Sequence, residues 1–110
     1  MRVGFTVYSN REEEIVPLSQ RAEALGFEGA WVGDHVVSPE KQSTEHPYET
    51  RVAMVLSGDD RMYDMWTIVG AIAGGTTRLK VSSGIYLLPL RHPLTSARAN
   101  HSSGTVSSED

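Results

Sequence analysis

The chain contains no cysteine, which excludes disulfides, thiolate metal sites and cysteine nucleophiles. It also lacks any run approaching the roughly 18 consecutive apolar residues that a membrane-spanning helix needs. Basic residues are outnumbered, because 10 Lys and Arg stand against 14 Asp and Glu for a formal net charge of −4. This balance argues against nucleic acid or an anionic membrane as a partner. The amino terminus has no signal-peptide layout, so a soluble cytoplasmic protein is expected.

Three common catalytic fingerprints are missing as well. The sequence has no G-x-G-x-x-G and no G-x-x-x-x-G-K-[ST], so the dinucleotide and P-loop folds lack their phosphate loops. It has no G-x-S-x-G nucleophile elbow. No helical or strand spacing pairs His35, His46 or His92, and no metal site is expected.

The hydrophobic pattern alternates between the strand and the helix period. Short β-rich runs at 3–7, 29–33 and 79–88 predict three strands. Apolar residues at helical spacing in 11–25 and 64–73 predict two helices between them. Strand–helix–strand order with short links favours a parallel sheet. The expected fold class is α/β, with three strand–helix units of which the third is unfinished.

The first helix has recognisable ends and one apolar stripe. Ser9 or Asn10 is expected as its N-cap, and Gly26 is expected to end it in the left-handed conformation. The buried stripe is expected to consist of four residues spaced by three or four positions: Ile15, Leu18, Ala22 and Leu25.

The candidate site lies at the end of the second strand, where Asp34 and His35 follow the apolar run Ala30-Trp31-Val32. In α/β folds the carboxyl ends of parallel strands are where ligands bind. Histidine is also the side chain whose ordinary pKa lies nearest neutrality, so His35 is the candidate catalytic residue. The alternative for His35 is an ordinary loop histidine. Asp34 is expected to orient His35, contact a ligand or cap a turn.

The remaining aromatic and histidine residues are interpreted as structural. Trp31 and Trp66 are expected in the core. His92, beside a proline, is expected to stabilise a turn, while His46 and His101 are expected to be solvated.

Two segments carry no clear period. Residues 36–63 contain prolines and charged stretches and are interpreted either as a mobile lid over the site or as disorder. A third helix is expected to begin at Pro93, with a pattern that does not continue beyond Ala99. Residues 100–110, which are rich in Ser, Gly and acids, are expected to form a disordered tail, leaving 1–99 as the domain.

Three stretches, in this order and spacing, resemble the amino-terminal part of the luciferase-like monooxygenase superfamily. They are ALGFEGAWVGDH at 24–35, WTIVGAIAGGTTRLKV at 66–81 and SGIYLLPLRHP at 83–93. The resemblance is strongest to the branch that uses the deazaflavin coenzyme F420, with FMN as the alternative cofactor. It implies an oxidoreductase that transfers hydride or activates oxygen on a small organic substrate.

The resemblance also implies roles for individual residues. His35 corresponds to the family histidine beside the cofactor ring, where it takes part in proton or hydride chemistry. Asp34 corresponds to a neighbour that contacts the ring. Gly84 and Ile85 correspond to a cofactor-binding bulge behind the ring, and the Gly84–Ile85 peptide bond is expected to be cis.

The family fold is a (β/α)8 barrel, which takes about 250 residues, whereas this chain has 110. The sequence therefore predicts an incomplete barrel with strands four to eight missing. Such a chain is not expected to bind cofactor or catalyse alone. Two alternatives stay open: a non-catalytic fragment that dimerises through exposed strand edges, and a small α/β binding module.

Overall fold

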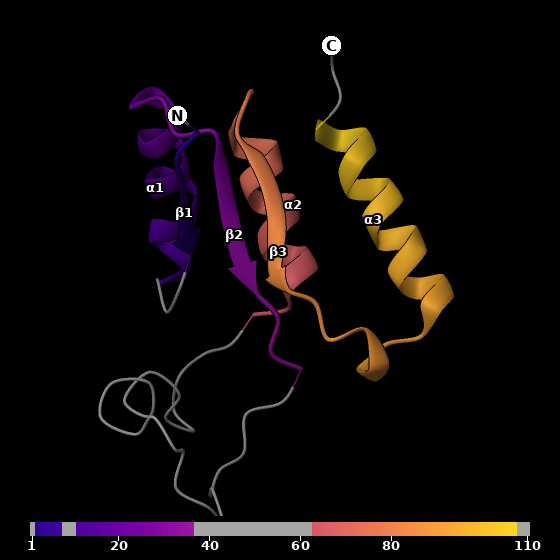
Figure 1. Cartoon of the computed structure of the whole chain (residues 1–110). Helices are drawn as coiled ribbons and strands as arrows, with labels where there is room; N and C mark the ends of the chain where they lie inside the picture. Colours follow the sequence, from indigo (N-terminus) through magenta and orange to yellow (C-terminus); the bar gives the residue numbers. More distant parts are fainter. Residues whose placement is uncertain (1, 8–10, 37–62, 108–110) are drawn as a thin grey trace, which may run out of the picture.

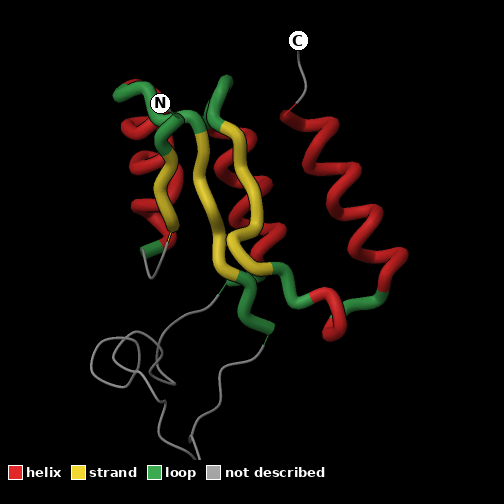
Figure 2. The backbone as a smooth tube through the Cα atoms, viewed as in Figure 1, coloured by secondary structure: helices red, strands yellow, loops and turns green. Residues whose placement is uncertain are grey.

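The computed structural model describes residues 2–7, 11–36 and 63–107. Seven elements follow one another: β1 (Gly4–Val7), α1 (Glu12–Ala24), β2 (Gly29–Gly33), α2 (Met65–Gly75), β3 (Lys80–Ile85), a 3-10 turn η2 (Leu88–Leu90) and α3 (Pro93–Ser107). The strands form one parallel sheet in the order β1-β2-β3 (Figures 1 and 2). The predicted α/β class with a parallel sheet is confirmed. The proposed lid at 36–63 lies, except for its end residues, outside the described residues.

Helix α1 ends as the sequence predicts but begins and packs differently. Gly26 has φ 86°, the left-handed conformation expected after the helix. The N-cap is Arg11, not Ser9 or Asn10. The buried face consists of Ile15, Ser19 and Ala22, while Leu18 and Leu25 are exposed. Ser19 tolerates burial because its hydroxyl donates to the Ile15 carbonyl at 2.8 Å.

The core lies between one face of the sheet and the helices. Strand side chains of Val7, Ala30 and Val32 pack there against Met65 and Ile72 of α2. In Figure 1, α1 and α2 lie behind the strands. Among the described elements no helix covers the opposite face of the sheet, which we call the bare face.

Trp31 lies on the bare face, and its predicted place in the core is wrong. Successive strand residues point to opposite faces, so Trp31 faces away from the buried Ala30 and Val32 and is 42% exposed. Its indole lies over the backbone of β1, where a Cβ added at Gly4 would come within 1.7 Å of the ring. Trp66 meets the expectation better, since it is half-buried and packs against the core.

Strand β3 contains a bulge at Gly84. Val32 pairs with Ser83 and Gly33 pairs with Ile85, so Gly84 is an extra residue without a partner on β2. The Gly84–Ile85 peptide bond is trans, and the predicted cis bond is wrong. One unpaired residue is enough to bend the strand here, so the bend does not need a cis peptide.

The loop before β3 is held by α1. The Glu23 carboxylate accepts the backbone N–H groups of Thr77, Arg78 and Leu79 at 2.5 to 2.9 Å. These bonds, that of Arg78 first, lower the pKa of Glu23. The contact sets where β3 starts relative to α1.

Helix α3 continues through Ser107, so the expectation of a disordered tail from Asn100 is corrected over 100–107. Ser102 and Ser103 donate their hydroxyls to the carbonyls of Arg98 and Ala99 at 2.9 and 3.0 Å. These bonds to the preceding turn let serines remain in a helix despite their modest propensity. A domain boundary at Ala99 stays a prediction. Within the described residues, no helix is both long and apolar enough to cross a membrane.

Candidate functional site

Asp34 is buried at the carboxyl end of β2, and its side chain has no exposed surface. One carboxylate oxygen accepts from Arg91 Nη2 at 2.5 Å. The other accepts from Arg91 Nε at 3.3 Å and from the Leu87 backbone N–H at 3.0 Å. This two-point pairing is the arrangement in which arginine and a carboxylate interact most strongly. Asp34 therefore ties β2 to the chain segment that follows β3.

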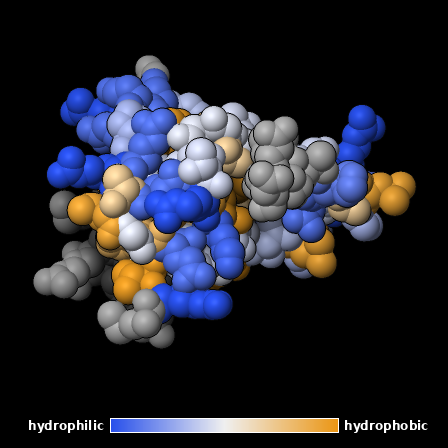
Figure 3. All heavy atoms as spheres, turned by 90° about the horizontal axis from the view of Figure 1, so that it is seen from above, coloured by the Kyte–Doolittle hydropathy of each residue, from blue (hydrophilic) through white to orange (hydrophobic). Residues whose placement is uncertain are grey.

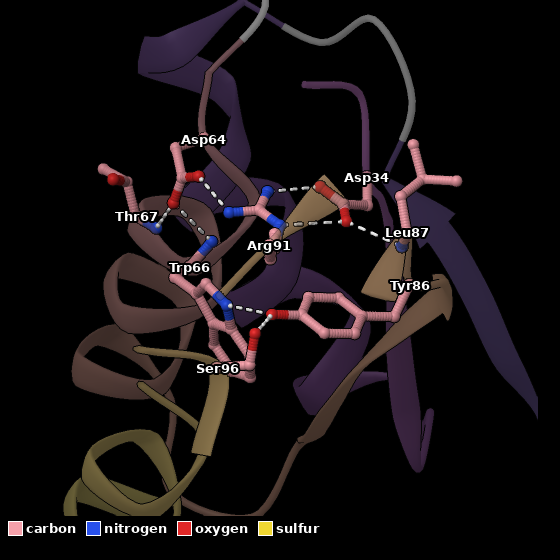
Figure 4. A network of polar contacts seen from close by, with 8 residues as sticks. All are labelled: Asp34, Asp64, Trp66, Thr67, Tyr86, Leu87, Arg91 and Ser96. Atoms are coloured by element: carbon pink, nitrogen blue, oxygen red, sulfur yellow. Dashed lines mark hydrogen bonds and ion pairs between the residues drawn. The ribbon is translucent and has the colours of Figure 1, made fainter. Parts of the chain in front are cut away.

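Arg91 also reaches a second carboxylate (Figure 4). Its Nη1 lies 3.2 Å from Asp64 Oδ2, and its guanidinium carbon lies 5.5 Å from the centre of the Tyr86 ring. Asp64 is the N-cap of α2 and accepts the N–H groups of Trp66 and Thr67 at 2.9 and 3.4 Å. One guanidinium thus joins β2, α2 and the β3–α3 connection. We call Asp34, Asp64 and Arg91 the rim triad.

A second chain of polar contacts runs beside the rim triad. Trp66 Nε1 donates to the Tyr86 hydroxyl at 3.4 Å, and that hydroxyl donates to Ser96 Oγ at 2.7 Å. The Trp66 and Tyr86 rings meet edge to face with centroids 5.8 Å apart. These contacts connect α2, the end of β3 and α3, so the site rests on three elements (Figure 4).

The charges of the rim triad stabilise one another. Burial alone raises the pKa of Asp34, but the hydrogen bonds from Arg91 and the Leu87 N–H, with the charges of Arg91 and His35, outweigh it. The net effect is a lowered pKa, so Asp34 stays ionised. The hydrogen bond to Asp34 is the largest cause that raises the pKa of Arg91. The hydrogen bond to Asp64 raises it further, and the two together outweigh burial, which lowers it.

His35 directly follows Asp34 and is half-buried. The bulge lies at the same edge of the sheet, because Gly33 pairs with Ile85. Of the predicted site residues, the structure thus brings Asp34, Gly84 and Ile85 together with His35 at the carboxyl ends of β2 and β3. An imidazole there, partly open to solvent, can exchange a proton with a bound molecule. Nothing in the contacts tests the assigned roles, which stay predictions.

The sequence pattern does not identify Arg91 and Tyr86 as site residues. No motif in the sequence singles out Arg91, although Asp34 needs a partner if it is buried. The available signal was position: Arg91 follows the third strand closely, so it arrives at the same sheet edge as Asp34. Spacing in the sequence could not show by itself that Arg91, and not another Lys or Arg, pairs with Asp34.

Most of the chain, including the rim, matches one known protein family. The family model described as luciferase-like monooxygenase matches residues 3–102. The chain belongs to the luciferase-like monooxygenase family. No curated protein matches it. The match runs from β1 into α3, so the rim triad, His35 and the bulge all lie within the luciferase-like part. The open three-stranded sheet agrees with part of a barrel.

A cleft of about 610 Å³ lies on the helix side of the sheet, between α2, β3 and α3. It is lined by Val69 and Met65 of α2, Ser83 of β3, and Ser96 and Asn100 of α3, among others. Neither Asp34 nor His35 lines it. The hydroxyl of Ser83 is buried without a hydrogen-bond partner among the described residues.

Proposed function

We propose that the carboxyl rim of β2 and β3 forms one wall of a flavin or deazaflavin site, in an oxidoreductase acting on a small organic substrate. The observation that carries the proposal is the luciferase-like match over a chain that brings His35 and the Gly84 bulge to one edge. Ligands of parallel α/β sheets bind at this edge. Coenzyme F420 is the cofactor we favour, FMN is the alternative, and a cytoplasmic location belongs to the same proposal.

The described residues fit the ring end of such a cofactor better than its phosphate end. The rim offers an imidazole and an irregular stretch of backbone at Gly84 and Ile85. Its arginine is already paired with two aspartates, so Arg91 is not available as a phosphate ligand. The residues that would hold the cofactor here are therefore His35, Gly84 and Ile85.

Each residue then has a physical task. A bound flavin or deazaflavin supplies the hydride or oxygen chemistry. His35 gives or takes a proton at its imidazole, whose ordinary pKa suits transfer near neutral pH. Asp34 acts through Arg91 and the Leu87 N–H, which hold the end of β3 against β2. In this proposal Asp34 positions the rim, and its contact with the ring is secondary.

Titration of the chain with FMN and with coenzyme F420, followed by cofactor fluorescence, tests the proposal. The proposal predicts binding of one of the two, against the expectation from chain length that an incomplete barrel binds no cofactor, and His35→Ala should keep that binding within a few-fold. Turnover, followed by cofactor absorbance with a panel of small substrates, should fall by about 10² to 10⁴-fold, the usual contribution of a general acid or base. His92→Ala is the control, because His92 is exposed and its Nδ1 accepts only from the nearby Leu94 N–H among the contacts observed. Absence of binding, or unchanged turnover in His35→Ala, would contradict the proposal.

A non-catalytic binding module is the second candidate, favoured by the cleft between α2, β3 and α3. Its volume lies within the range of small-molecule pockets, about 300–1,000 Å³. A ligand held there would be insensitive to His35→Ala. It would instead lose affinity when Ser96→Leu fills the cleft.

A further inference from the structure

Three residues come together on the bare face at the carboxyl ends of β2 and β3. Gly33 lies two residues after Trp31 and so shares its face, and Ile85 pairs directly with Gly33. A Cβ built on Gly84 would lie 3.8 Å from the Trp31 Cβ. The bulge thus turns two successive residues of β3, Gly84 and Ile85, to the bare face beside Trp31.

The Trp31 side chain extends from this point toward the amino end of the sheet. Its six-membered ring lies over Gly4 and Gly29, which pair with each other near the amino ends of β1 and β2. A Cβ added at Gly4 would overlap the ring, so this position of the indole requires glycine there. Trp31 therefore crosses the bare face from the bulge on β3 to the start of β1.

Charged side chains occupy the amino end of the sheet. Glu28 lies 3.4 Å from Arg2 and 3.5 Å from Lys80, and Figure 3, which looks onto this end, shows hydrophilic side chains over much of it. At the carboxyl end, the buried charge of Asp34 is paired with Arg91. Polar groups lose free energy when an apolar surface displaces their water. The carboxyl end of the indole is therefore the favourable side for a flat aromatic molecule to approach.

We infer that Trp31 forms the floor of the cofactor site, with its indole against the ring that Gly84 and Ile85 hold. The inference rests on the proposed function and adds the residue that limits how far the ring enters toward the amino end. Aromatic rings pack favourably against one another in offset or edge-to-face arrangements. The cleft on the helix side of the sheet is lined by Trp66 and not by Trp31, so it is a different site.

The two tryptophans of the chain lie on opposite sides of the sheet, so they report separately where a cofactor binds. Trp66→Phe leaves Trp31 as the only tryptophan, and Trp31→Phe leaves Trp66. Each variant is saturated with FMN or with coenzyme F420, and its emission is quenched with acrylamide. The bound cofactor should lower the quenching constant of Trp31 and leave that of Trp66 unchanged.

Each other outcome has a distinct meaning. A cofactor that binds but leaves Trp31 unprotected overturns the inference alone, and protection of Trp66 would then assign binding to the cleft. Equal protection of both tryptophans indicates a general tightening of the fold and also overturns it. Binding of neither cofactor to the wild-type chain contradicts the proposed function together with the inference. If circular dichroism shows a variant to be unfolded, hydroxyl-radical footprinting of the wild-type chain, analysed by mass spectrometry, makes the same comparison.

Gly4→Ala tests the indole from the opposite end of the strand. The added Cβ should push the ring toward the bulge and raise the cofactor dissociation constant at least about tenfold, equivalent to about 1.4 kcal/mol. Gly29→Ala is the matched control, because its Cβ would lie 3.5 Å from the indole, an ordinary contact.

A double-mutant cycle separates the indole from strain in β1, since the Cβ at Gly4 would also lie 2.8 Å from the Gly29 carbonyl oxygen. In the Trp31→Ala background, where the overlap with the ring is gone, Gly4→Ala should raise the dissociation constant much less. An equal effect of Gly4→Ala with and without the indole would overturn the inference.

Discussion

At the scale of single residues, the charges of the rim triad depend on one another. The Asp34 side chain is fully buried and the Arg91 side chain is 19% exposed, so each relies on the other to stay charged. Removing one partner of a buried pair leaves an uncompensated charge, which costs more than the pair contributes. The pair therefore stabilises the fold only when both Asp34 and Arg91 are present.

Asp34→Asn should lower the free energy of unfolding by about 3 kcal/mol, the lower part of the range for a broken buried ion pair. The amide keeps the shape but leaves Arg91 without its main counter-charge. Urea denaturation measures the change. Glu13→Gln is the control, because Glu13 is exposed in the first turn of α1, and its effect should stay within about 0.5 kcal/mol. An equally small change in Asp34→Asn would show that the pair does not stabilise the fold.

The lowered pKa of Asp34 predicts an acid limb in stability. The unfolded chain binds this proton more readily than the folded chain, so the stabilisation is complete above the ordinary pKa of 3.8. It is lost as the pH falls through the lower pKa of the folded state. The free energy of unfolding, measured by urea titration from pH 6 to pH 2.5, should fall more steeply in the wild type than in Asp34→Asn. Parallel curves would contradict this assignment.

At the scale of elements, the ends of the helices are set by local chemistry and their faces by packing. Asp64 caps α2 because its carboxylate accepts N–H groups of the first turn. Gly26 lets the chain leave α1 toward β2. By contrast, the buried face of α1 is rotated relative to the stripe expected from its leucines, because the sheet and α2 select Ile15 and Ala22.

Two glycine-to-alanine substitutions should change the free energy of unfolding in opposite directions. Gly26→Ala should destabilise by about 1 to 2 kcal/mol, since an L-residue is strained at its positive φ. Gly70→Ala, inside α2 with no atom within 4 Å of the added Cβ, should stabilise by about 0.5 to 1 kcal/mol. Thermal unfolding of both variants measures the difference. A shift of the same sign in both would contradict the assigned conformations.

At the scale of the whole molecule, one small core holds three strands to two helices. Its centre is Ile72, which is completely buried, while Leu94 of α3 is 75% exposed. A domain of this size has only about 5 to 15 kcal/mol of net stability. Removing one central side chain therefore costs a large part of the total net stability.

Ile72→Ala should cost about 2 to 5 kcal/mol, the range for deleting a buried aliphatic side chain. Leu94→Ala removes a side chain of the same volume from the surface and should change stability by less than about 0.5 kcal/mol. Denaturation at low protein concentration, followed by circular dichroism, compares the two. Similar losses would show that α3 packs more tightly than its exposure indicates.

The local pattern of the sequence was sufficient for the strand–helix order, the left-handed Gly26 and the place of Asp34 and His35 after β2. These features depend on periodicity, on backbone freedom and on which residues terminate strands, and all of them act over a few positions. The resemblance to the luciferase-like family was carried by the same segments and is confirmed over residues 3–102.

Tertiary structure alone decided which faces are covered and which charges meet. Trp31 is exposed because no described helix lies over its side of the sheet, and Arg91 pairs with Asp34 across 57 positions of sequence. The trans bulge at Gly84 depends on its register with β2. Such features arise from contacts between elements distant in sequence. The hydrophobic period of one segment does not determine which other segment packs against it.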